Sequence, residues 1–295
     1  MDWTPPKLVK WISSDLEEKG FPQPHRFQAE MLVSHALEIS RLDIYLQHDK
    51  PCTPLEQKKV RELVKRRYRR EPVAYIVGSC EFWTLKLEVG PGVLIPRPDT
   101  EVLVEAVAER FAGHSDRQRV RILELGTGSA AIPLALCNEL SDLDIVTVEF
   151  SKQALEFASR NISTYSNLLA EKRNTITTIK GDKFSSIRAE PLFDLIISNP
   201  PYIPNTQFES LQKDVTDWEP RIALSGGDSG MEFYDYLHDA SASRLKSGGC
   251  LIVEHGFDQV ESIRDLFRNS QYFELQEQRK DYSGNDRVLA FKKKN

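Results

Sequence analysis

Short apolar segments alternate with segments of helical periodicity between residues 120 and 254. Such alternation is typical of a parallel sheet with helices on both faces. A final pair of segments, Tyr272–Arg279 and Arg287–Phe291, is expected to close the sheet as an antiparallel hairpin. The sequence therefore predicts a doubly wound α/β domain. Its parallel strands are expected at Val120–Leu125, Asp144–Glu149, Thr175–Ile179, Phe193–Ser198 and Cys250–Glu254, and its helices at about 130–140, 151–162, 231–246 and 258–269.

Residues 1–72 show a different pattern, in which apolar side chains such as Leu8, Ile12 and Leu16 recur at helical spacing. Thr53-Pro54-Leu55-Glu56 has the form of a capping box, with proline at the first helical position. These features predict a small all-helical N-terminal domain, which we assign to residues 1–72.

Residues 73–95 contain strand-like stretches broken by glycines. Tyr75-Ile76-Val77 and Leu85–Val89 are expected to pair as a β-hairpin that links the two domains. The α/β domain then covers residues 96–295. Near its start, Asp99 or Thr100 is expected to cap the next helix, because both residue types accept backbone N–H bonds at helix N-termini.

Composition excludes several classes of protein. The 295 residues carry a net charge of −5, which provides no overall field for nucleic acid. The four cysteines and six histidines are dispersed, so we expect reduced thiols, no metal site and a cytoplasmic location. No apolar run is long enough to span a bilayer. Residues 58–70 hold eight basic side chains against one acidic, which indicates either a solvated helix face or a docking patch for an acidic or RNA-bearing partner.

A glycine turn follows the first predicted parallel strand. Gly126 and Gly128 allow a tight turn whose backbone N–H groups can approach a ligand closely. Glu149 ends the next strand, where a carboxylate can accept from both hydroxyls of a ribose. Asp182 follows the third strand and could accept from an adenine amine. The turn and Glu149 suit a nicotinamide enzyme and an S-adenosylmethionine enzyme equally well.

Asn199-Pro200-Pro201-Tyr202 follows the fourth strand and favours the second of these possibilities. The prolines restrict the backbone around them, so the carbonyls of Asn199 and Pro200 are not used in a helix. The Asn199 side-chain oxygen and the Pro200 backbone carbonyl would form a rigid pair of acceptors for a planar NH₂ group. Tyr202 could pack its ring on the same plane. A methyl transfer to nitrogen needs such a pair, whereas hydride transfer does not.

The combination of motifs resembles the HemK-type release-factor glutamine methyltransferases, also called peptide chain release factor N5-glutamine methyltransferases. The Asn-Pro-Pro-Tyr motif is shared with adenine-specific DNA methyltransferases, but its combination with the Ile-Pro-Arg-Pro segment and a helical N-terminal domain is more specific. The similar segments are Glu71–Gly78 with Glu81-Phe82-Trp83, Ile95–Glu101, Leu125–Ser129, Ser198–Ile203, Glu219-Pro220 with Ala223-Leu224, and Asp286-Arg287-Val288.

The resemblance implies a Rossmann-like class I S-adenosylmethionine-dependent methyltransferase domain, preceded by the small helical domain and the hairpin linker. It implies methyl transfer from S-adenosylmethionine to the side-chain amide nitrogen of the glutamine in the Gly-Gly-Gln motif of class 1 peptide chain release factors, which tunes translation termination. The expected partner is a release factor, with no membrane and no direct nucleic-acid substrate.

The resemblance also implies roles for individual residues. The expected catalytic residues are Asn199, Pro200 and Tyr202, and Pro201 joins them in binding substrate. Arg97 is expected either to order the loop over the cofactor or to form a salt bridge in its own domain. The expected cofactor-binding residues are Gly126, Thr127, Gly128, Ser129, Ala130, Glu149, Asp182, Lys183 and Asn199.

Three of these positions depart from the family pattern. Glu149 stands where the family more often has aspartate, and its extra methylene group is expected to be tolerated. Ala130 stands where the family usually has glycine, and its methyl group is expected to crowd the cofactor slightly while its backbone N–H stays available. Lys183 replaces a frequent aromatic residue, which leaves Lys183 and Phe184 as candidates for the adenine contact.

Three alternative functions remain at this stage. An N6-adenine-specific nucleic-acid methyltransferase also presents a planar amine to Asn-Pro-Pro-Tyr, although this chain has no evident basic, aromatic-rich target-recognition domain. A nicotinamide oxidoreductase would use only the glycine turn and Glu149. A non-catalytic module that binds S-adenosylmethionine and a partner would not need the intact Asn-Pro-Pro-Tyr motif.

Overall fold

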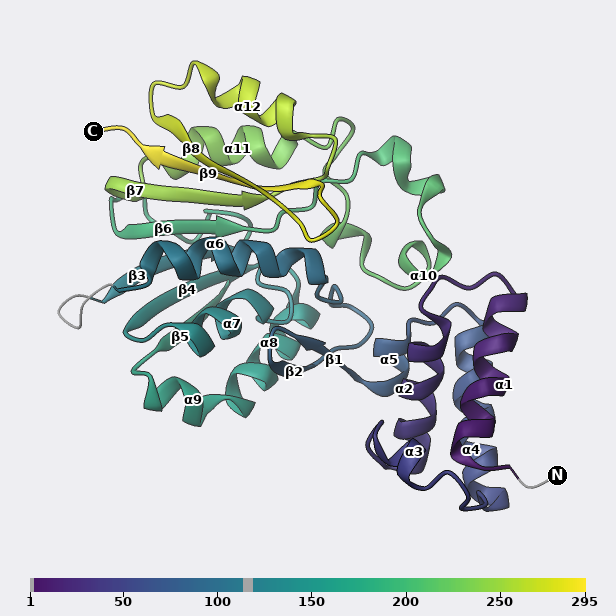
Figure 1. Ribbon diagram of the computed structural model, residues 1–295. Helices are drawn as coiled ribbons and strands as arrows, with labels where there is room; N and C mark the ends of the chain where they lie inside the picture. Colours follow the sequence, from purple (N-terminus) through teal and green to yellow (C-terminus); the bar gives the residue numbers. More distant parts are fainter. Residues whose placement is uncertain (1–2, 114–118) are drawn as a thin grey trace. The chain divides into compact units, whose positions relative to one another are not determined.

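The computed structural model describes residues 3–113 and 119–295 (Figure 1). The chain divides into two compact units, one of Met1–Ser79 with Gln212–Trp218 and the other of Cys80–Leu211 with Glu219–Asn295. We call them the helical unit and the methyltransferase-fold unit. In the described ranges, no helix is long and apolar enough to cross a membrane.

The helical unit packs its helices around a core that includes Ile12, Leu16, Leu32 and Val60. Thr53 caps the fourth helix in the predicted capping box with Glu56. The helices of this unit are α1 (Pro5–Glu18), α2 (His25–Leu37), α3 (Asp43–Leu46), α4 (Pro54–Tyr68), α5 (Val73–Val77) and, from a distant part of the chain, α10 (Lys213–Thr216).

The prediction of a strand at Tyr75-Ile76-Val77 is wrong, because these residues lie in α5. Pro72 precedes this helix with a φ of −57° and a ψ of 139°, and Gly78 ends it with a φ of 76°. Glycine adopts this left-handed conformation without strain, so it stops a helix readily. The β-hairpin instead forms further along the chain, between β1 (Ser79–Phe82) and β2 (Leu85–Glu88).

Buried polar contacts hold the segment Gln212–Trp218 within the helical unit. The guanidinium of Arg67 is almost fully buried and donates to Asp214 Oδ2 at 2.5 Å and to Gln28 Oε1 at 2.9 Å. Trp218 Nε1 donates to the carbonyl of Arg69 at 3.1 Å. At least Arg67 of the basic run at residues 58–70 therefore has a structural role, because its guanidinium is buried and hydrogen-bonded within the helical unit.

The methyltransferase-fold unit contains a seven-stranded sheet in the order β5-β4-β3-β6-β7-β9-β8. The first five strands in this order are parallel, and β9 and β8 close the sheet as the predicted antiparallel hairpin. The doubly wound α/β fold predicted from the sequence is confirmed. The strands are β3 (Val120–Leu125), β4 (Leu143–Glu149), β5 (Thr175–Lys180), β6 (Phe193–Ser198), β7 (Leu245–Glu254), β8 (Phe273–Lys280) and β9 (Asp286–Lys293).

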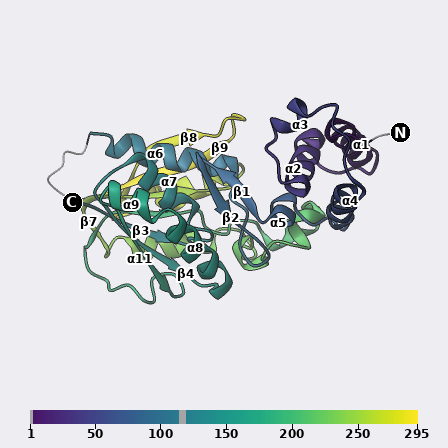
Figure 2. The ribbon, with the colours of Figure 1, turned by 90° about the horizontal axis from the view of Figure 1, so that it is seen from below.

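Helices cover both faces of this sheet because its inner strands are apolar on both sides. Successive residues of a strand, such as Ile122 and Leu123, belong in turn to two separate cores, one on each face of the sheet. One core includes α6 (Glu101–Phe111), α7 (Ala131–Glu139), α8 (Lys152–Thr164) and α9 (Ser166–Glu171), and the other includes α11 (Glu232–Ser241) and α12 (Val260–Arg268). The β1–β2 hairpin lies beside α8 in both ribbon views, where Asn161 Oδ1 accepts from the backbone N–H of Glu88 at 2.7 Å (Figures 1 and 2).

Short 3₁₀ helices complete the loops at the carboxyl edge of the sheet. Thr100 precedes α6 but makes no side-chain cap, so the cap predicted at Asp99 or Thr100 is absent and the Thr100 hydroxyl is used elsewhere. The short 3₁₀ helices are η1 (Pro98–Thr100), η2 (Asn205–Ser210) and η3 (Arg221–Ala223).

Candidate active site

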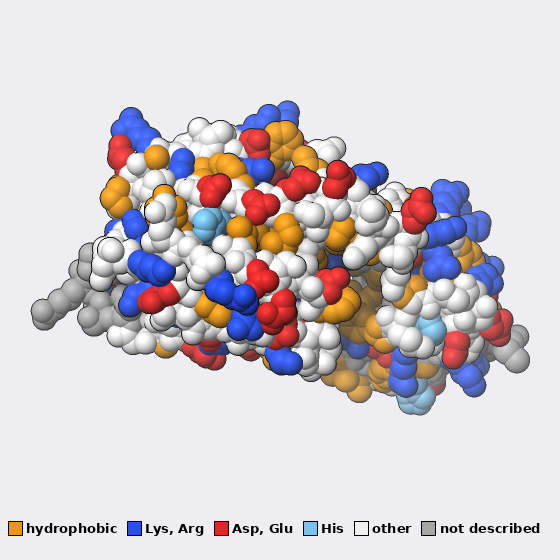
Figure 3. Space-filling view, turned by 90° about the horizontal axis from the view of Figure 1, so that it is seen from above, with side chains coloured by type: hydrophobic (Ala, Val, Ile, Leu, Met, Phe, Trp, Pro, Cys, Tyr) orange, Lys and Arg blue, Asp and Glu red, His pale blue; other side chains and the backbone are white. Residues whose placement is uncertain are grey.

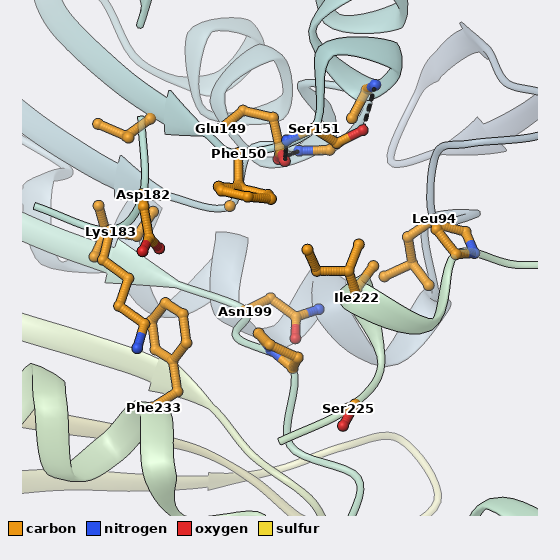
Figure 4. Close-up of a pocket in the computed structure, with 18 of the residues that line it drawn as sticks. Leu94, Glu149, Phe150, Ser151, Asp182, Lys183, Asn199, Ile222, Ser225 and Phe233 are labelled. Carbon is orange, nitrogen blue, oxygen red and sulfur yellow. Dashed lines mark hydrogen bonds between the residues drawn. The ribbon is translucent and has the colours of Figure 1, made fainter. Parts of the chain in front are cut away.

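A cavity of about 390 Å³ lies at the carboxyl edge of the parallel strands, where ligands bind in open α/β sheets. The carboxyl ends of four neighbouring strands and the loops that follow them contribute to it through Gly126, Glu149, Asp182 and Asn199. Figure 4 shows the side chains of Glu149, Asp182 and Asn199 on different sides of the same space. Four motifs that lie far apart in the sequence therefore meet at one site.

The glycine turn lines the cavity through Gly126 and Gly128. Their φ angles are 79° and 56°, and a Cβ atom at either position would meet nothing within 4 Å. The backbone conformation, not crowding, is therefore what requires glycine. Thr127 and Ser129 are buried and are not among the residues that line the cavity.

The structure corrects both expectations for Ala130. Its side chain is fully buried in the core instead of facing the cavity, so its methyl group does not crowd a ligand there. Its backbone N–H donates to the carbonyl of Thr127 at 2.8 Å and is therefore not available to a ligand. Ala130 directly precedes α7 and adopts a φ of 64°, which is strained for a residue with a Cβ atom.

Glu149 lies at the end of β4 and faces the cavity with a carboxylate that the backbone holds in place. Oε1 accepts from the backbone N–H of Ser151 at 2.7 Å, and Oε2 accepts from the backbone N–H of Gly128 at 2.9 Å. A carboxylate has about four acceptor positions, so each oxygen can still accept from a ligand hydroxyl. The turn after β3 and the end of β4 thus position this group together.

In the loop after β5, burial distinguishes the side chains that face the cavity from those that do not. Asp182 and Lys183 line the cavity, whereas Phe184 is almost fully buried and stacks on Tyr236 at 5.6 Å between ring centroids. The suggestion that Phe184 contacts adenine is therefore wrong. Lys183 Nζ lies 4.7 Å from the centroid of the Tyr236 ring.

Sequence reasoning missed three apolar residues of the cavity wall: Phe150, Ile222 and Phe233. Phe150 is 56% exposed and Ile222 is 55% exposed, although both are large and apolar (Figure 4). Exposed apolar side chains in a cavity are typical of a site that covers an aromatic ligand. One signal was available in the sequence, because Phe150 directly follows the strand-ending Glu149.

The Asn-Pro-Pro-Tyr segment enters the site by its first and third residues. Asn199 and Pro201 line the cavity, while Pro200 is buried behind them. Tyr202 is not among the lining residues, and its hydroxyl donates to Glu254 Oε1 at 3.4 Å. Burial raises the pKa of Tyr202, so its phenol stays protonated.

The amide of Asn199 has a defined orientation. Its Nδ2 donates to Thr100 Oγ1 at 3.0 Å, and its Oδ1 accepts no hydrogen bond from any residue in the described ranges. Since Asn199 lines the cavity, that oxygen is left for a ligand. The hydroxyl that was expected to cap α6 is thus used to orient Asn199.

Arg97 forms the salt bridge that was one of its two expected roles. Its Nη2 lies 2.5 Å from Glu219 Oε1, and Glu219 Oε2 accepts from the backbone N–H of Ile95 at 3.1 Å. One buried carboxylate therefore joins the Ile-Pro-Arg-Pro segment to the Glu-Pro segment.

Comparison with known proteins follows the same motifs. The family described as "PrmC N-terminal domain" matches residues 7–78, and the one described as "Methyltransferase small domain" matches residues 98–216. The chain is 39% identical to the release factor glutamine methyltransferase of Geobacter sulfurreducens, over 98% of this chain and 96% of the relative. The chain belongs to the release factor glutamine methyltransferases. The Escherichia coli member is 37% identical, over 94% of this chain and 96% of its own length.

Solved structures support the fold of this release factor glutamine methyltransferase family member. A methyltransferase from Pyrococcus furiosus superposes with a TM-score of 0.51 at 18% identity, over 81% of this chain and 99% of that one. At this identity the likeness concerns the fold alone. The family assigned from sequence is confirmed, and membership of a methyltransferase family implies S-adenosylmethionine as the methyl donor.

Proposed function

We propose that this chain transfers a methyl group from S-adenosylmethionine to the side-chain amide nitrogen of the glutamine in the Gly-Gly-Gln motif of class 1 peptide chain release factors. The observation that carries the proposal is the free Oδ1 of Asn199 in the cavity wall. This oxygen has a fixed position, because Nδ2 of the same amide is hydrogen-bonded to Thr100 Oγ1. A fixed acceptor suits the NH₂ group of a carboxamide. The curated relatives carry the name of this activity.

The residues of the cavity suit the proposed cofactor. Phe150, Ile222 and Phe233 offer an apolar wall for an adenine ring, and the carboxylates of Glu149 and Asp182 offer acceptors for hydroxyl and amine donors. We propose that Glu149 holds the ribose hydroxyls and that Asp182 accepts from the adenine amine. S-adenosylmethionine, when bound, supplies a sulfonium-bound methyl group that a nitrogen lone pair can attack.

The chain's own contribution is orientation and electrostatic stabilisation. An amide nitrogen is a weak nucleophile, because its lone pair is shared with the carbonyl group. Asn199 Oδ1 and the Pro200 carbonyl would accept its two N–H bonds, which aims the nitrogen and stabilises the positive charge that develops on it. The proton would then leave after the methyl transfer, since the Asn-Pro-Pro-Tyr segment carries no strong base.

The helical unit is proposed to bind the release factor away from its Gly-Gly-Gln loop. Of the basic run, Arg67 is committed to Asp214 and Arg66 to Glu71, whereas Lys65 and Arg69 are exposed on the unit's surface. Replacing both Lys65 and Arg69 by Glu should lower kcat/KM for the whole factor about tenfold. Activity on a short Gly-Gly-Gln peptide should stay at the parent level, and an equal loss on both substrates would contradict this role.

The activity is tested by incubating the protein with labelled S-adenosylmethionine and a release factor, DNA or RNA in turn. The proposal expects label on the release factor, mapped by mass spectrometry to the glutamine of Gly-Gly-Gln. Label on adenine and none on the factor would overturn it in favour of the nucleic-acid alternative. The net charge of −5 and the mixture of acidic and basic side chains on the face in Figure 3 favour the protein substrate. The proposed location is the cytoplasm, which fits the four free cysteines.

A further inference from the structure

The strand order divides the carboxyl edge of the sheet into two parts that meet at Asn199. The ends of β5, β4, β3 and β6 contribute to the cavity, and no residue after Phe233 in the described part of the chain lines it. The ends of β7, β9 and β8 lie on the other side of β6. Asn199 directly follows β6, so it stands at the boundary between the two parts.

This boundary limits how a polypeptide substrate can reach Asn199. In the proposed function the cofactor fills the cavity, so the chain on either side of the target glutamine cannot lie there. The carboxamide must still come within hydrogen-bond distance of Asn199 Oδ1. The flanking chain is therefore left with the other part of the edge, which the turns after β7 and between β8 and β9 form.

Each of these two turns exposes a large aromatic side chain. Phe257, three residues after β7, is 64% exposed, and Tyr282, between β8 and β9, is 68% exposed. The antiparallel pairing of β9 with β7 brings both turns to the carboxyl edge. Within the described part of the methyltransferase-fold unit, these are the two most exposed large apolar side chains, and the next two, Phe150 and Ile222, line the cavity. Exposed apolar side chains that gather at one edge mark a surface for a partner.

Hydrogen bonds tie both turns to the Asn-Pro-Pro-Tyr segment. Gln259 Nε2, in the turn after β7, donates to the carbonyl of Tyr202 at 2.9 Å. The buried guanidinium of Arg287 donates to the carbonyl of His255 at 3.1 Å and to Asp281 Oδ2 at 3.0 Å, which joins the β8–β9 turn to the turn after β7. The two aromatic residues therefore stand on a fixed base next to the site.

The surroundings of the two aromatic residues are mainly acidic. The Tyr282 hydroxyl donates to Oε1 of a glutamate on α6, and Arg287 Nη2 lies 3.4 Å from an aspartate of η1 (Figure 1). Lys280, at the end of β8, is exposed, whereas Arg287 is buried. These charges disfavour phosphate groups and favour a chain with basic side chains. The acidic residues are Asp99, Glu105, Asp258 and Asp286.

We propose that Phe257 and Tyr282 form a docking surface for the segment of the release factor that flanks the Gly-Gly-Gln glutamine. This inference rests on the proposed function and names residues outside the cavity that bind its protein substrate. The two rings bind apolar side chains of the segment, and the carboxylates around them bind basic side chains. The surface contributes to affinity for the release factor and leaves the affinity for S-adenosylmethionine unchanged.

The test compares Phe257→Ala and Tyr282→Ala with the parent. Each should raise KM for a release factor about tenfold, as for truncation of an aromatic anchor, and should keep kcat nearly unchanged. Tyr282→Phe keeps the ring and should stay close to the parent. The control is Tyr272→Ala, because Tyr272 is also an exposed aromatic residue but precedes β8, at the opposite edge of the sheet. Calorimetry should give the parent's affinity for S-adenosylmethionine in every variant.

A short peptide that contains Gly-Gly-Gln and its flanking residues locates the contact. Phe257→Ala should raise KM for this peptide as it does for the whole factor, because the surface binds the chain next to the glutamine. Asp258→Lys should also raise KM for both substrates, and more strongly at low ionic strength. The variants of Lys65 and Arg69, in contrast, should affect the whole factor alone.

Parent-like KM in both Phe257→Ala and Tyr282→Ala, or an equal rise in Tyr272→Ala, would overturn the inference. Weaker binding of an RNA oligonucleotide by Phe257→Ala, with an unchanged KM for the factor, would assign the surface to nucleic acid and overturn it too. A loss of S-adenosylmethionine affinity in Phe257→Ala would place this residue in the cofactor site and contradict the docking role. A parent that methylates no release factor would instead count against the proposed function.

Discussion

Asn199 Nδ2 donates a hydrogen bond to Thr100 Oγ1 over 3.0 Å, although the two residues lie 99 positions apart in the sequence. The bond joins the Ile-Pro-Arg-Pro segment to the Asn-Pro-Pro-Tyr segment. It also decides which end of the Asn199 amide is free for a ligand. The most characteristic motif of the chain is thus positioned by a residue outside it.

Glu149→Gln is expected to weaken binding of S-adenosylmethionine by about 2 kcal/mol, because hydrogen bonds to a charged group contribute roughly that much. Isothermal titration calorimetry measures the change. Glu156→Gln is the matched control, since Glu156 lies exposed on α8, away from the cavity. Equal affinity in Glu149→Gln and the control would remove Glu149 from the cofactor site.

Phe150→Ala is expected to weaken cofactor binding by about 1 kcal/mol, the usual contribution of an aromatic pair beyond its buried area. The melting temperature should hardly change, because the ring is 56% exposed in the structure. Phe257→Ala is a suitable control, as Phe257 is 64% exposed and does not line the cavity. A loss of affinity in the control as large as in Phe150→Ala would contradict the proposed adenine contact.

Much of this architecture could be predicted from the sequence because it follows from local patterns. Apolar strands and the glycine turn depend on neighbouring residues, and the parallel strands bring their carboxyl ends to one edge. The helix at Val73–Val77 was missed because β-branched residues favour strands. Pro72 before it and Gly78 after it favour a short helix instead. The role of Thr100 in orienting Asn199 could not be predicted, since it depends on a contact between distant segments.

The assignment of Gln212–Trp218 to the helical unit was equally beyond local patterns. Arg67 and Asp214 are 147 positions apart, and nothing in either segment indicates the other. Exposure of single side chains, as at Phe150 and Ile222, is also a tertiary property. Periodicity predicts which face of an element is buried, but not which apolar residue is left open to a ligand.

Asp214→Asn is expected to destabilise the helical unit by about 3 kcal/mol, because it leaves the buried guanidinium of Arg67 without its counter-charge. Urea unfolding followed by circular dichroism measures the change. Asp217→Asn, on the exposed end of the same segment, is the control. A destabilisation of Asp214→Asn within 0.5 kcal/mol of that control, roughly the range of neutral surface changes, would show that the ion pair contributes little.

Glu124 predicts a pH dependence of stability in the methyltransferase-fold unit. Burial raises the pKa of this carboxyl group to about 8, while Thr127 lowers it and Glu149 raises it further. The folded chain therefore keeps a proton that the unfolded chain releases near its ordinary pKa of 4.5. The stability that this proton contributes is complete below pH 4.5 and is lost as the pH rises toward 8.

Glu124→Gln has no such proton to lose. Relative to the parent, its free energy of unfolding should increase by about 2 kcal/mol between pH 6 and pH 8. Urea unfolding at the two pH values measures both proteins. A constant difference between parent and variant would mean that Glu124 does not titrate in this range.

The central claim concerns the free oxygen of Asn199, and the methyl-transfer rate of Asn199→Ala tests it most directly. Single-turnover methylation of a release factor is measured with S-adenosylmethionine saturating and its affinity checked by calorimetry. The account predicts a rate ~10²–10³ lower than the parent, as for loss of one oriented partner of a transition state, with nearly unchanged cofactor affinity. A variant that transfers the methyl group at the parent rate would contradict it.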